Sequence, residues 1–237
     1  MFKKQNRFQL IGLFFLILTL AFNGFKYKNY FHNDANNKII IFDYDDTLTK
    51  KGSTFYIIKY FQDSFQIEPE EIKRVLKEFK NLDKNNLENI KTFWIDYGKS
   101  KNREITNEWF LNLKKILEAS IEIDPEMLKL VFLLKEKGHR VVIFSDMDQM
   151  RAQIAKKRGY FDHFDNVFLG CDLKYKKPDL RAYDFLISVL NRDPKDCIFI
   201  DDKEKNIVAA QKNNIDSIIF ISYESLKNDL ENRKILY

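Results

Sequence analysis

The segment IIIFDYDDTLT at residues 39–49 constrains the fold because an apolar run ends abruptly in carboxylates. The β-branched residues and phenylalanine at 39–42 predict a buried strand, and continuous apolar strands are typical of parallel sheets. Asp43 and Asp45 follow at positions i and i+2, with Thr47 two residues further on. Open α/β sheets bind ligands at the carboxyl ends of their strands, where these side chains would lie. Two carboxylates this close repel each other unless a cation joins them or one keeps its proton.

A strand followed by an acidic surface turn would produce the same local pattern, so the remainder of the chain decides between the two. Four more strand-like runs follow, and amphipathic helical patterns alternate with them. The strands are expected at 140–144, 167–169, 197–200 and 217–221, and the helices at 126–137, 149–158, 179–191 and 203–213. This alternation implies right-handed crossovers and a parallel sheet covered on both faces. The predicted fold class is therefore α/β, with a three-layer Rossmann-like core formed by residues 38–50 and 124–237.

Residues 51–123 have no strand pattern and form a predicted helical insert. Its four helices are expected at 54–65, 69–82, 86–99 and 106–119. Because the insert directly follows the acidic loop, we expect it to lie over that loop as a cap. Aromatic residues at helical spacing either line a pocket there or form the core of the helical bundle. The candidates are Tyr56, Tyr60, Phe93, Trp94, Tyr97 and Trp109.

The first 25 residues carry three cations followed by an apolar run at 10–22. A run of this length suits the core of a signal peptide better than a membrane-spanning helix, which needs about 20 apolar residues. An uncleaved membrane anchor through residues 8–25 is the alternative, and a buried helix of the domain is a third interpretation. We expect an exported or membrane-anchored protein, with a cytoplasmic location as the alternative. Residues 26–37 are polar and asparagine-rich, as in a linker.

The charge distribution argues against a nucleic-acid partner. The chain has a net charge of +5, and residues 1–28 contain five cations and no acid, so the remainder is neutral. A protein that binds a phosphate backbone should present a basic face, and no basic block occurs in the globular part. With 45% apolar and 32% charged residues, the composition is that of a folded globular protein.

Polar residues follow three of the other predicted strands. Ser145 and Asp146 end the second strand, Lys177 belongs to the KKPD segment after the third, and Asp201 and Asp202 end the fourth. In a parallel sheet these ends lie at one edge, where several acids together need a hard divalent cation such as Mg²⁺. Each residue alone has a structural alternative, as a helix cap or a solvated lysine. The predicted site residues are Asp43, Asp45, Thr47, Ser145, Lys177, Asp201 and Asp202.

The motifs FDYDDTLT, VVIFSD, KKPD and IFIDDKEKN, in this order, resemble the haloacid dehalogenase-like hydrolase superfamily across about residues 38–230. The segment IFIDDKEKNIVAAQKNNI looks like the branch with a helical cap inserted after the first motif, which consists mainly of sugar- and other small-metabolite phosphatases. Dehalogenases of this fold lack the second acid of the first motif, so Asp45 favours phosphoryl chemistry. Two departures from the family pattern are Asp46 and Asn213-Asn214, at positions where glycine is common.

The resemblance implies roles for the acids. Asp43 attacks phosphorus and forms an aspartyl-phosphate, while Asp45 protonates the leaving oxygen and later accepts a proton from water. Mg²⁺ is expected on Asp43, the backbone carbonyl of Asp45, Asp201 and Asp202.

The same resemblance implies that Ser145 and Lys177 hold the phosphoryl oxygens, and that Thr47, also at the substrate end of the site, orders the loop. Asn206 is expected to support the acidic loop. The implied function is a Mg²⁺-dependent phosphatase acting on a small phosphorylated metabolite. A phosphomutase of the same superfamily and a membrane-tethered binding protein without turnover are the alternatives, and the substrate and oligomeric state stay open.

Overall fold

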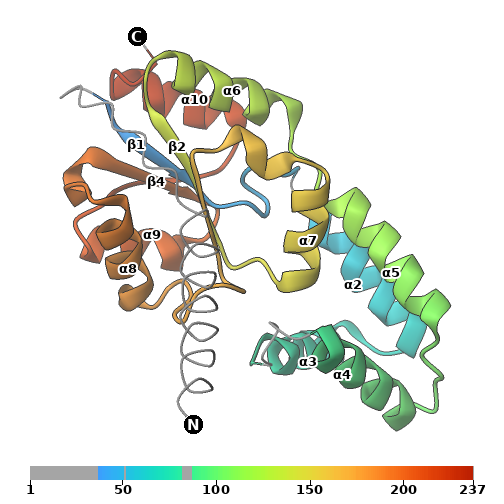
Figure 1. Ribbon diagram of the computed structural model, residues 1–237. Helices are drawn as coiled ribbons and strands as arrows, with labels where there is room; N and C mark the ends of the chain where they lie inside the picture. The colour runs from blue at the N-terminus through green and yellow to red at the C-terminus, as the bar shows by residue number, and fades with distance from the viewer. Residues whose placement is uncertain (1–36, 51, 82–86, 237) are drawn as a thin grey trace, which may run out of the picture.

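The core of the protein is a five-stranded parallel sheet (Figure 1). The computed structural model describes residues 37–50, 52–81 and 87–236. The strands lie in the order β3-β2-β1-β4-β5. Their bounds are β1 Ile39–Phe42, β2 Arg140–Ser145, β3 Asn166–Leu169, β4 Cys197–Asp201 and β5 Asp216–Ile219. The predicted α/β class and parallel sheet are confirmed.

Strand β1 is the central strand, and its four residues are almost completely buried. Ile40 pairs with Val141 of β2 on one side and with Ile198 of β4 on the other. The chain runs from β1 outward to β2 and β3 and then returns to β4 and β5. The strand order therefore reverses between β1 and β4, which is where open α/β sheets form ligand-binding crevices.

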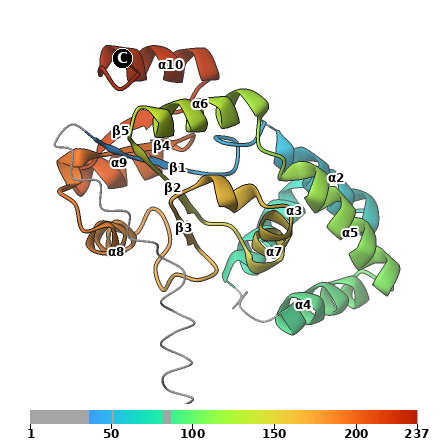
Figure 2. The ribbon, with the colours of Figure 1, turned by 45° about the horizontal axis from the view of Figure 1, so that its top comes forward.

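Helices cover both faces of the sheet, as expected for strands that are apolar on both sides. Ile40 and Phe42 belong to the core shared with α6, α7 and α10, whereas Ile39 and Ile41 belong to the core shared with α8 and α9. Figure 2 shows α6 and α10 on one side of the sheet and α8 on the other. The bounds are α6 Pro125–Glu136, α7 Gln149–Lys157, α8 Leu180–Leu190, α9 Glu204–Lys212 and α10 Tyr223–Asn232, with short 3₁₀ helices at Tyr160–His163 and Pro194–Asp196.

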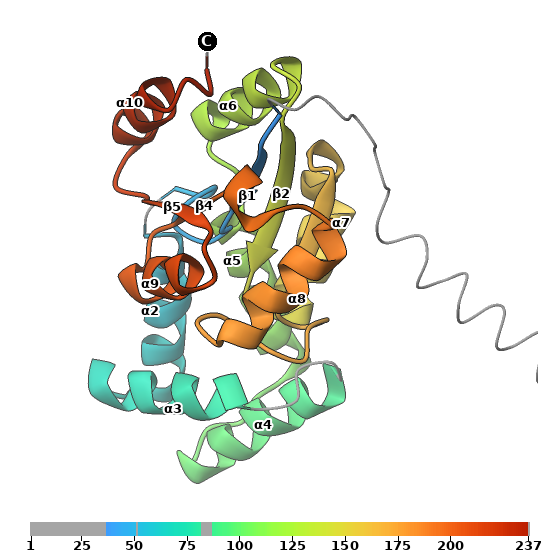
Figure 3. The same ribbon diagram turned by 90° about the vertical axis from the view of Figure 1, so that its left-hand side faces the viewer.

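The insert after β1 is helical, as predicted. It contains α2 Ser53–Phe65, α3 Pro69–Asn81, α4 Leu87–Ser100 and α5 Asn107–Ser120. Figure 3 shows α3 and α4 below the core, with α2 and α5 running down towards them. The two segments that join this layer to the core lie together, because Thr49 and Ile123 form a β-bridge and the Asp124 amide donates to the Leu48 carbonyl at 2.9 Å.

Aromatic stacking holds the insert together. The Trp94 ring stacks on Phe61 with centroids 4.3 Å apart and lies 5.8 Å from Phe65, also stacked. Trp109 contacts the same cluster and donates its Nε1–H to Ser64 at 2.8 Å. Most of the predicted pocket aromatics therefore pack within the helical bundle.

The predicted signal peptide or anchor at 1–25 and nearly all of the linker at 26–37 lie outside the described residues. In the part of the chain that the structure describes, every helix is too short or too polar to cross a membrane. Export or membrane attachment stays a prediction of the N-terminal sequence.

Candidate active site

The ends of β1 and β4 bring the predicted acids together. The Asp43 amide donates to the Ile200 carbonyl of β4 at 2.8 Å, so Asp43 lies beside Asp201, the last residue of that strand. Carboxylate oxygens of Asp43, Asp201 and Asp202 lie within 4.8 Å of one another. Three oxygen donors at this spacing fit a hard divalent cation, which would also relieve their mutual repulsion.

Lys177 lies between two of these acids. Its Nζ is 2.8 Å from Asp43 Oδ1 and 2.6 Å from Asp201 Oδ2, and all three side chains are at most 5% exposed. Burial works to lower the pKa of Lys177, but the charges of Asp43 and Asp201 outweigh it and raise that pKa. Burial raises the pKa of Asp43 to about 7, against the opposing charge of Lys177. The lysine is held charged, and Asp43 is protonated more easily than an ordinary aspartate.

Asp45 points to a different partner, Arg151 in the first turn of α7. The guanidinium of Arg151 binds the Asp45 carboxylate through two parallel hydrogen bonds, one of them 2.6 Å from Nη1 to Oδ2. Burial works to raise the pKa of Asp45, but Arg151 outweighs it and lowers that pKa. Asp45 is therefore held as a carboxylate, and its side chain is engaged by Arg151 rather than by the group of Asp43, Asp201 and Asp202.

Asp201 is held in place by the first turn of α9. The Asn206 side-chain amide donates to both carboxylate oxygens at 2.9 Å, and the Lys203 amide donates to Oδ1 at 2.8 Å. Asn206 thus supports the acidic loop, as expected. The Lys203 ammonium lies 3.0 Å from Asp202 and 3.9 Å from Asp43, which makes it a second cation against the acids.

Two predicted hydroxyl groups are buried at the site. Ser145 and Thr47 are 1% and 0% exposed, and neither side-chain oxygen has a hydrogen-bond partner among the described residues. A buried hydroxyl without a partner is unfavourable unless a ligand or water supplies one. Ser145 lines the cavity described below, where it can meet a ligand, whereas Thr47 is not among the described lining residues.

The two departures from glycine are accommodated by the backbone. Asp46 and Asn214 both have φ 58°, the left-handed conformation that glycine adopts most readily and that Asp and Asn tolerate better than other residues. The Asp46 carboxylate accepts the Gly52 amide at 3.0 Å, which closes the turn. The loop that carries Asp43 and Asp45 therefore keeps its shape without a glycine.

A family model for the haloacid dehalogenase-like hydrolases matches residues 37–214, well over half of the chain. The chain belongs to the haloacid dehalogenase-like hydrolases. The resemblance in the four motifs is thereby confirmed.

Similar proteins agree with the family and the fold. A sesquiterpene phosphatase of Aspergillus oryzae is 29% identical over 37% of this chain and 45% of its own length. The first curated relatives are matched over less than two thirds of their length. A predicted hydrolase of this family from Porphyromonas gingivalis has a TM-score of 0.65 at 18% identity, covering 83% of this chain and 98% of that one. An enzyme of the family from Bacteroides thetaiotaomicron, crystallised with magnesium and inorganic phosphate, has a TM-score of 0.60 at 17% identity, covering 80% and 98%.

A cavity of about 610 Å³ lies between the acidic strand ends and the cap of this hydrolase. The predicted site residues Asp43, Asp45, Ser145 and Lys177 line it. Of the six aromatic residues proposed for a pocket, Trp94 is the one found in the described lining. The expectation that the insert covers the acidic loop is thus confirmed, although other residues form most of the cover.

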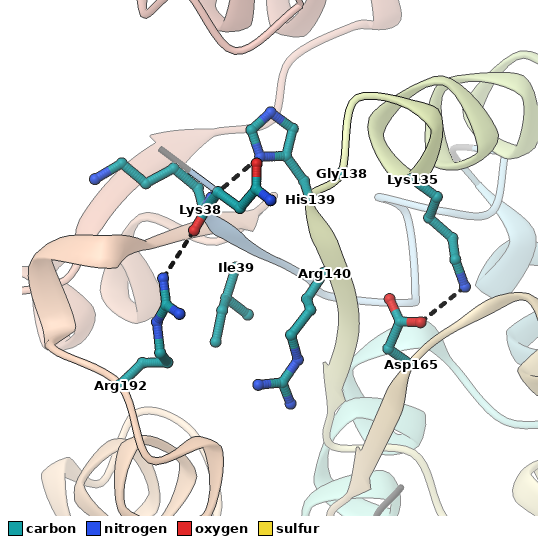
Figure 4. A pocket seen from close by; sticks show the side chains of 9 residues that line it. Lys38, Ile39, Lys135, Gly138, His139, Arg140, Asp165 and Arg192 are labelled. Atoms are coloured by element: carbon teal, nitrogen blue, oxygen red, sulfur yellow. Dashed lines mark hydrogen bonds and ion pairs between the residues drawn. The ribbon is translucent and has the colours of Figure 1, made fainter. Parts of the chain in front are cut away.

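A smaller cavity of about 170 Å³ lies at the opposite, amino-terminal ends of the strands (Figure 4). Its charged groups interact with one another and with the backbone: Lys135 pairs with Asp165 at 2.9 Å, and Arg192 donates to the Asn37 carbonyl at 2.9 Å. Asp43, one of the three acids that could hold a cation, lines the larger cavity instead, so that cavity is the candidate active site.

Sequence reasoning missed two residues of this hydrolase site. Arg151 lies in the first turn of α7, outside the four motifs, and Lys203 lies directly before α9, within the IFIDDKEKN motif but without a predicted role. Both lie at helix starts that follow predicted site residues, Arg151 shortly after Asp146 and Lys203 directly after Asp202.

Proposed function

We propose that this hydrolase is a Mg²⁺-dependent phosphatase that cleaves a small phosphorylated metabolite through an aspartyl-phosphate on Asp43. The arrangement of Asp43 carries the proposal: it pairs with a buried lysine, lies close to two further carboxylates and lines the large cavity. Two similar proteins support the proposal. The Bacteroides enzyme was crystallised with magnesium and inorganic phosphate, and the Aspergillus relative is a sesquiterpene phosphatase.

Mg²⁺ on Asp43, Asp201 and Asp202, with the Asp45 backbone carbonyl as a further ligand, would neutralise charge on the phosphoryl group and align it with Asp43. An Asp43 carboxylate oxygen then attacks phosphorus, and the bond from phosphorus to the ester oxygen breaks. Lys177 and the unpartnered Ser145 hydroxyl donate hydrogen bonds to the phosphoryl oxygens as charge builds up on them.

Asp45 supplies the proton that the departing alcohol needs and afterwards accepts one from the water that hydrolyses the aspartyl-phosphate. Inorganic phosphate leaves, and Asp43 is regenerated. Because Arg151 holds Asp45 as a carboxylate, the first of these transfers requires that their paired hydrogen bonds open when substrate enters and that Asp45 takes up a proton from solvent. Arg151 is then available to the phosphate, whose negative charge competes for its guanidinium.

The test is hydrolysis of p-nitrophenyl phosphate by the full chain, with Mg²⁺ and with EDTA, for wild type and for Asp43→Asn. Asp184→Asn is the matched control, because Asp184 is exposed on α8 away from the cavity. We expect turnover that needs Mg²⁺, is retained by the control and is lost in Asp43→Asn. Retention of more than a few per cent of activity by Asp43→Asn would remove Asp43 as the nucleophile.

A further inference from the structure

The cavity of this hydrolase divides sharply between a charged side and an apolar side. Every charged residue in the described lining comes from the core, including Asp43, Lys177 and Arg151. Every described lining residue from the cap is apolar. They are Ile57, Ile58, Phe61, Leu76, Phe79, Ile90, Trp94, Leu113 and Leu117.

Some of these apolar side chains are not needed to fill the interior of the helical bundle. Phe61, Ile90 and Trp94 are nearly fully buried, as bundle core should be. Ile57 and Ile58 of α2 and Leu76 and Phe79 of α3, in contrast, are only partly buried and face the same cavity as the catalytic acids. These four side chains leave an apolar surface directly opposite the phosphate end.

Such a surface discriminates between leaving groups. The hydroxyls of a sugar would lose their water there and find few hydrogen-bond partners, since among the described cap residues of the lining the Trp94 indole carries the one side-chain donor. Buried polar groups without partners disfavour binding, whereas apolar groups gain from leaving water.

We infer that the substrate is the phosphate monoester of an apolar alcohol, whose hydrocarbon part packs against the cap while its phosphate lies between Asp43 and Lys177. This inference rests on the proposed phosphatase function. A volume of about 610 Å³ leaves room for a hydrocarbon part well beyond the phosphate. The segregation of charge also orients the ligand, because the cations of the described lining, which attract the phosphate, lie on the core side.

The first test is a series of straight-chain alkyl phosphates, from methyl to octyl, assayed with the full chain and Mg²⁺ below their micelle-forming concentrations. Glucose 6-phosphate serves as a polar ester of similar size. We expect kcat/KM to rise by up to about fourfold for each methylene that the cavity buries, and octyl phosphate to exceed glucose 6-phosphate. A flat series, or a preference for the sugar phosphate, would overturn the inference while leaving the phosphatase intact. No turnover of any monoester would refute the phosphatase itself.

Two Leu→Asn variants test the position of the hydrocarbon part. Leu76 lines the cavity from α3, whereas Leu111 is 58% exposed on α5 and is not a lining residue. We expect Leu76→Asn to lower the ratio of kcat/KM for octyl over methyl phosphate by roughly tenfold, because a buried amide replaces apolar contact. Leu111→Asn should leave that ratio unchanged. An equal ratio in both variants would show that the apolar group does not bind the cap.

Discussion

Replacing Lys177 by methionine should destabilise the metal-free protein strongly. Lys177 makes ion pairs of 2.8 and 2.6 Å with Asp43 and Asp201, and its own side chain is 1% exposed. Methionine preserves most of the volume and removes the charge, so the loss reflects electrostatics and not a cavity. Removing one partner of a buried ion pair leaves an uncompensated charge and costs about 3–5 kcal/mol of unfolding free energy.

The loss should depend on pH in a defined direction. The folded-state pKa of Asp43 is raised to about 7 even with Lys177 present, and without the lysine it rises further. A carboxyl whose folded pKa exceeds its unfolded value loses stability as pH rises from the unfolded pKa to the folded pKa. Lys177, whose pKa is raised, stays charged throughout this range. The difference between wild type and Lys177→Met should therefore be smaller at pH 5 than at pH 8.

Urea unfolding in EDTA at the two pH values measures both effects. Lys176→Met is the matched control, because the neighbouring Lys176 is exposed and should change stability little. Adding Asp43→Asn to Lys177→Met should restore much of the stability at pH 8, since it removes one of the two carboxylate charges that lose Lys177 as a partner. Two results would refute this electrostatic explanation. One is a loss of unfolding free energy in Lys177→Met at pH 8 no larger than in Lys176→Met, and the other is an equal loss at both pH values.

Three further predictions concern the neighbouring groups. In Arg151→Met, the pKa of Asp45 should rise because the charge that most strongly opposes burial is removed. The alkaline limb of the kcat/KM profile should then move to higher pH, and an unmoved limb would show that Asp45 is not the general acid. Mg²⁺ binding measured by calorimetry should weaken by about tenfold per pH unit below pH 7, because Asp43 must lose its proton; affinity independent of pH would contradict this. Asn206→Leu should lower the unfolding free energy by about 1–3 kcal/mol, since Asp201 loses two buried hydrogen bonds; denaturant titration within error of wild type would show that Asn206 does not support Asp201.

Much of the fold follows from local pattern. Strands alternate with helices along the sequence, as in parallel α/β folds. The sequence alone therefore predicts that Asp43 and Asp201 lie at the same edge of the sheet. Helix α10 was not predicted, although Ser222 caps it and its leucines at 226 and 230 are one turn apart. Its short, polar sequence gives a weak signal, and burial against α6 and the sheet is what makes it stable.

The contacts of the site depend on packing that local pattern does not contain. Arg151 binds Asp45 because α7 begins beside the acidic loop, although the two residues are more than 100 positions apart in the sequence. Likewise, spacing alone could not tell which cap aromatics face the cavity, because Trp94 lines it while Tyr97 and Trp109 pack in the bundle. Helical periodicity identifies an apolar face but not the partner against which that face packs.

The central claim is that Asp43 becomes phosphorylated during turnover. Acid quenching of the full chain during steady-state hydrolysis, followed by proteolysis and mass spectrometry, tests it directly. The account predicts a phosphoryl group on the peptide that contains Asp43, present with Mg²⁺ and absent with EDTA. Steady turnover with that peptide unmodified, or with the phosphoryl group on another residue, would contradict it.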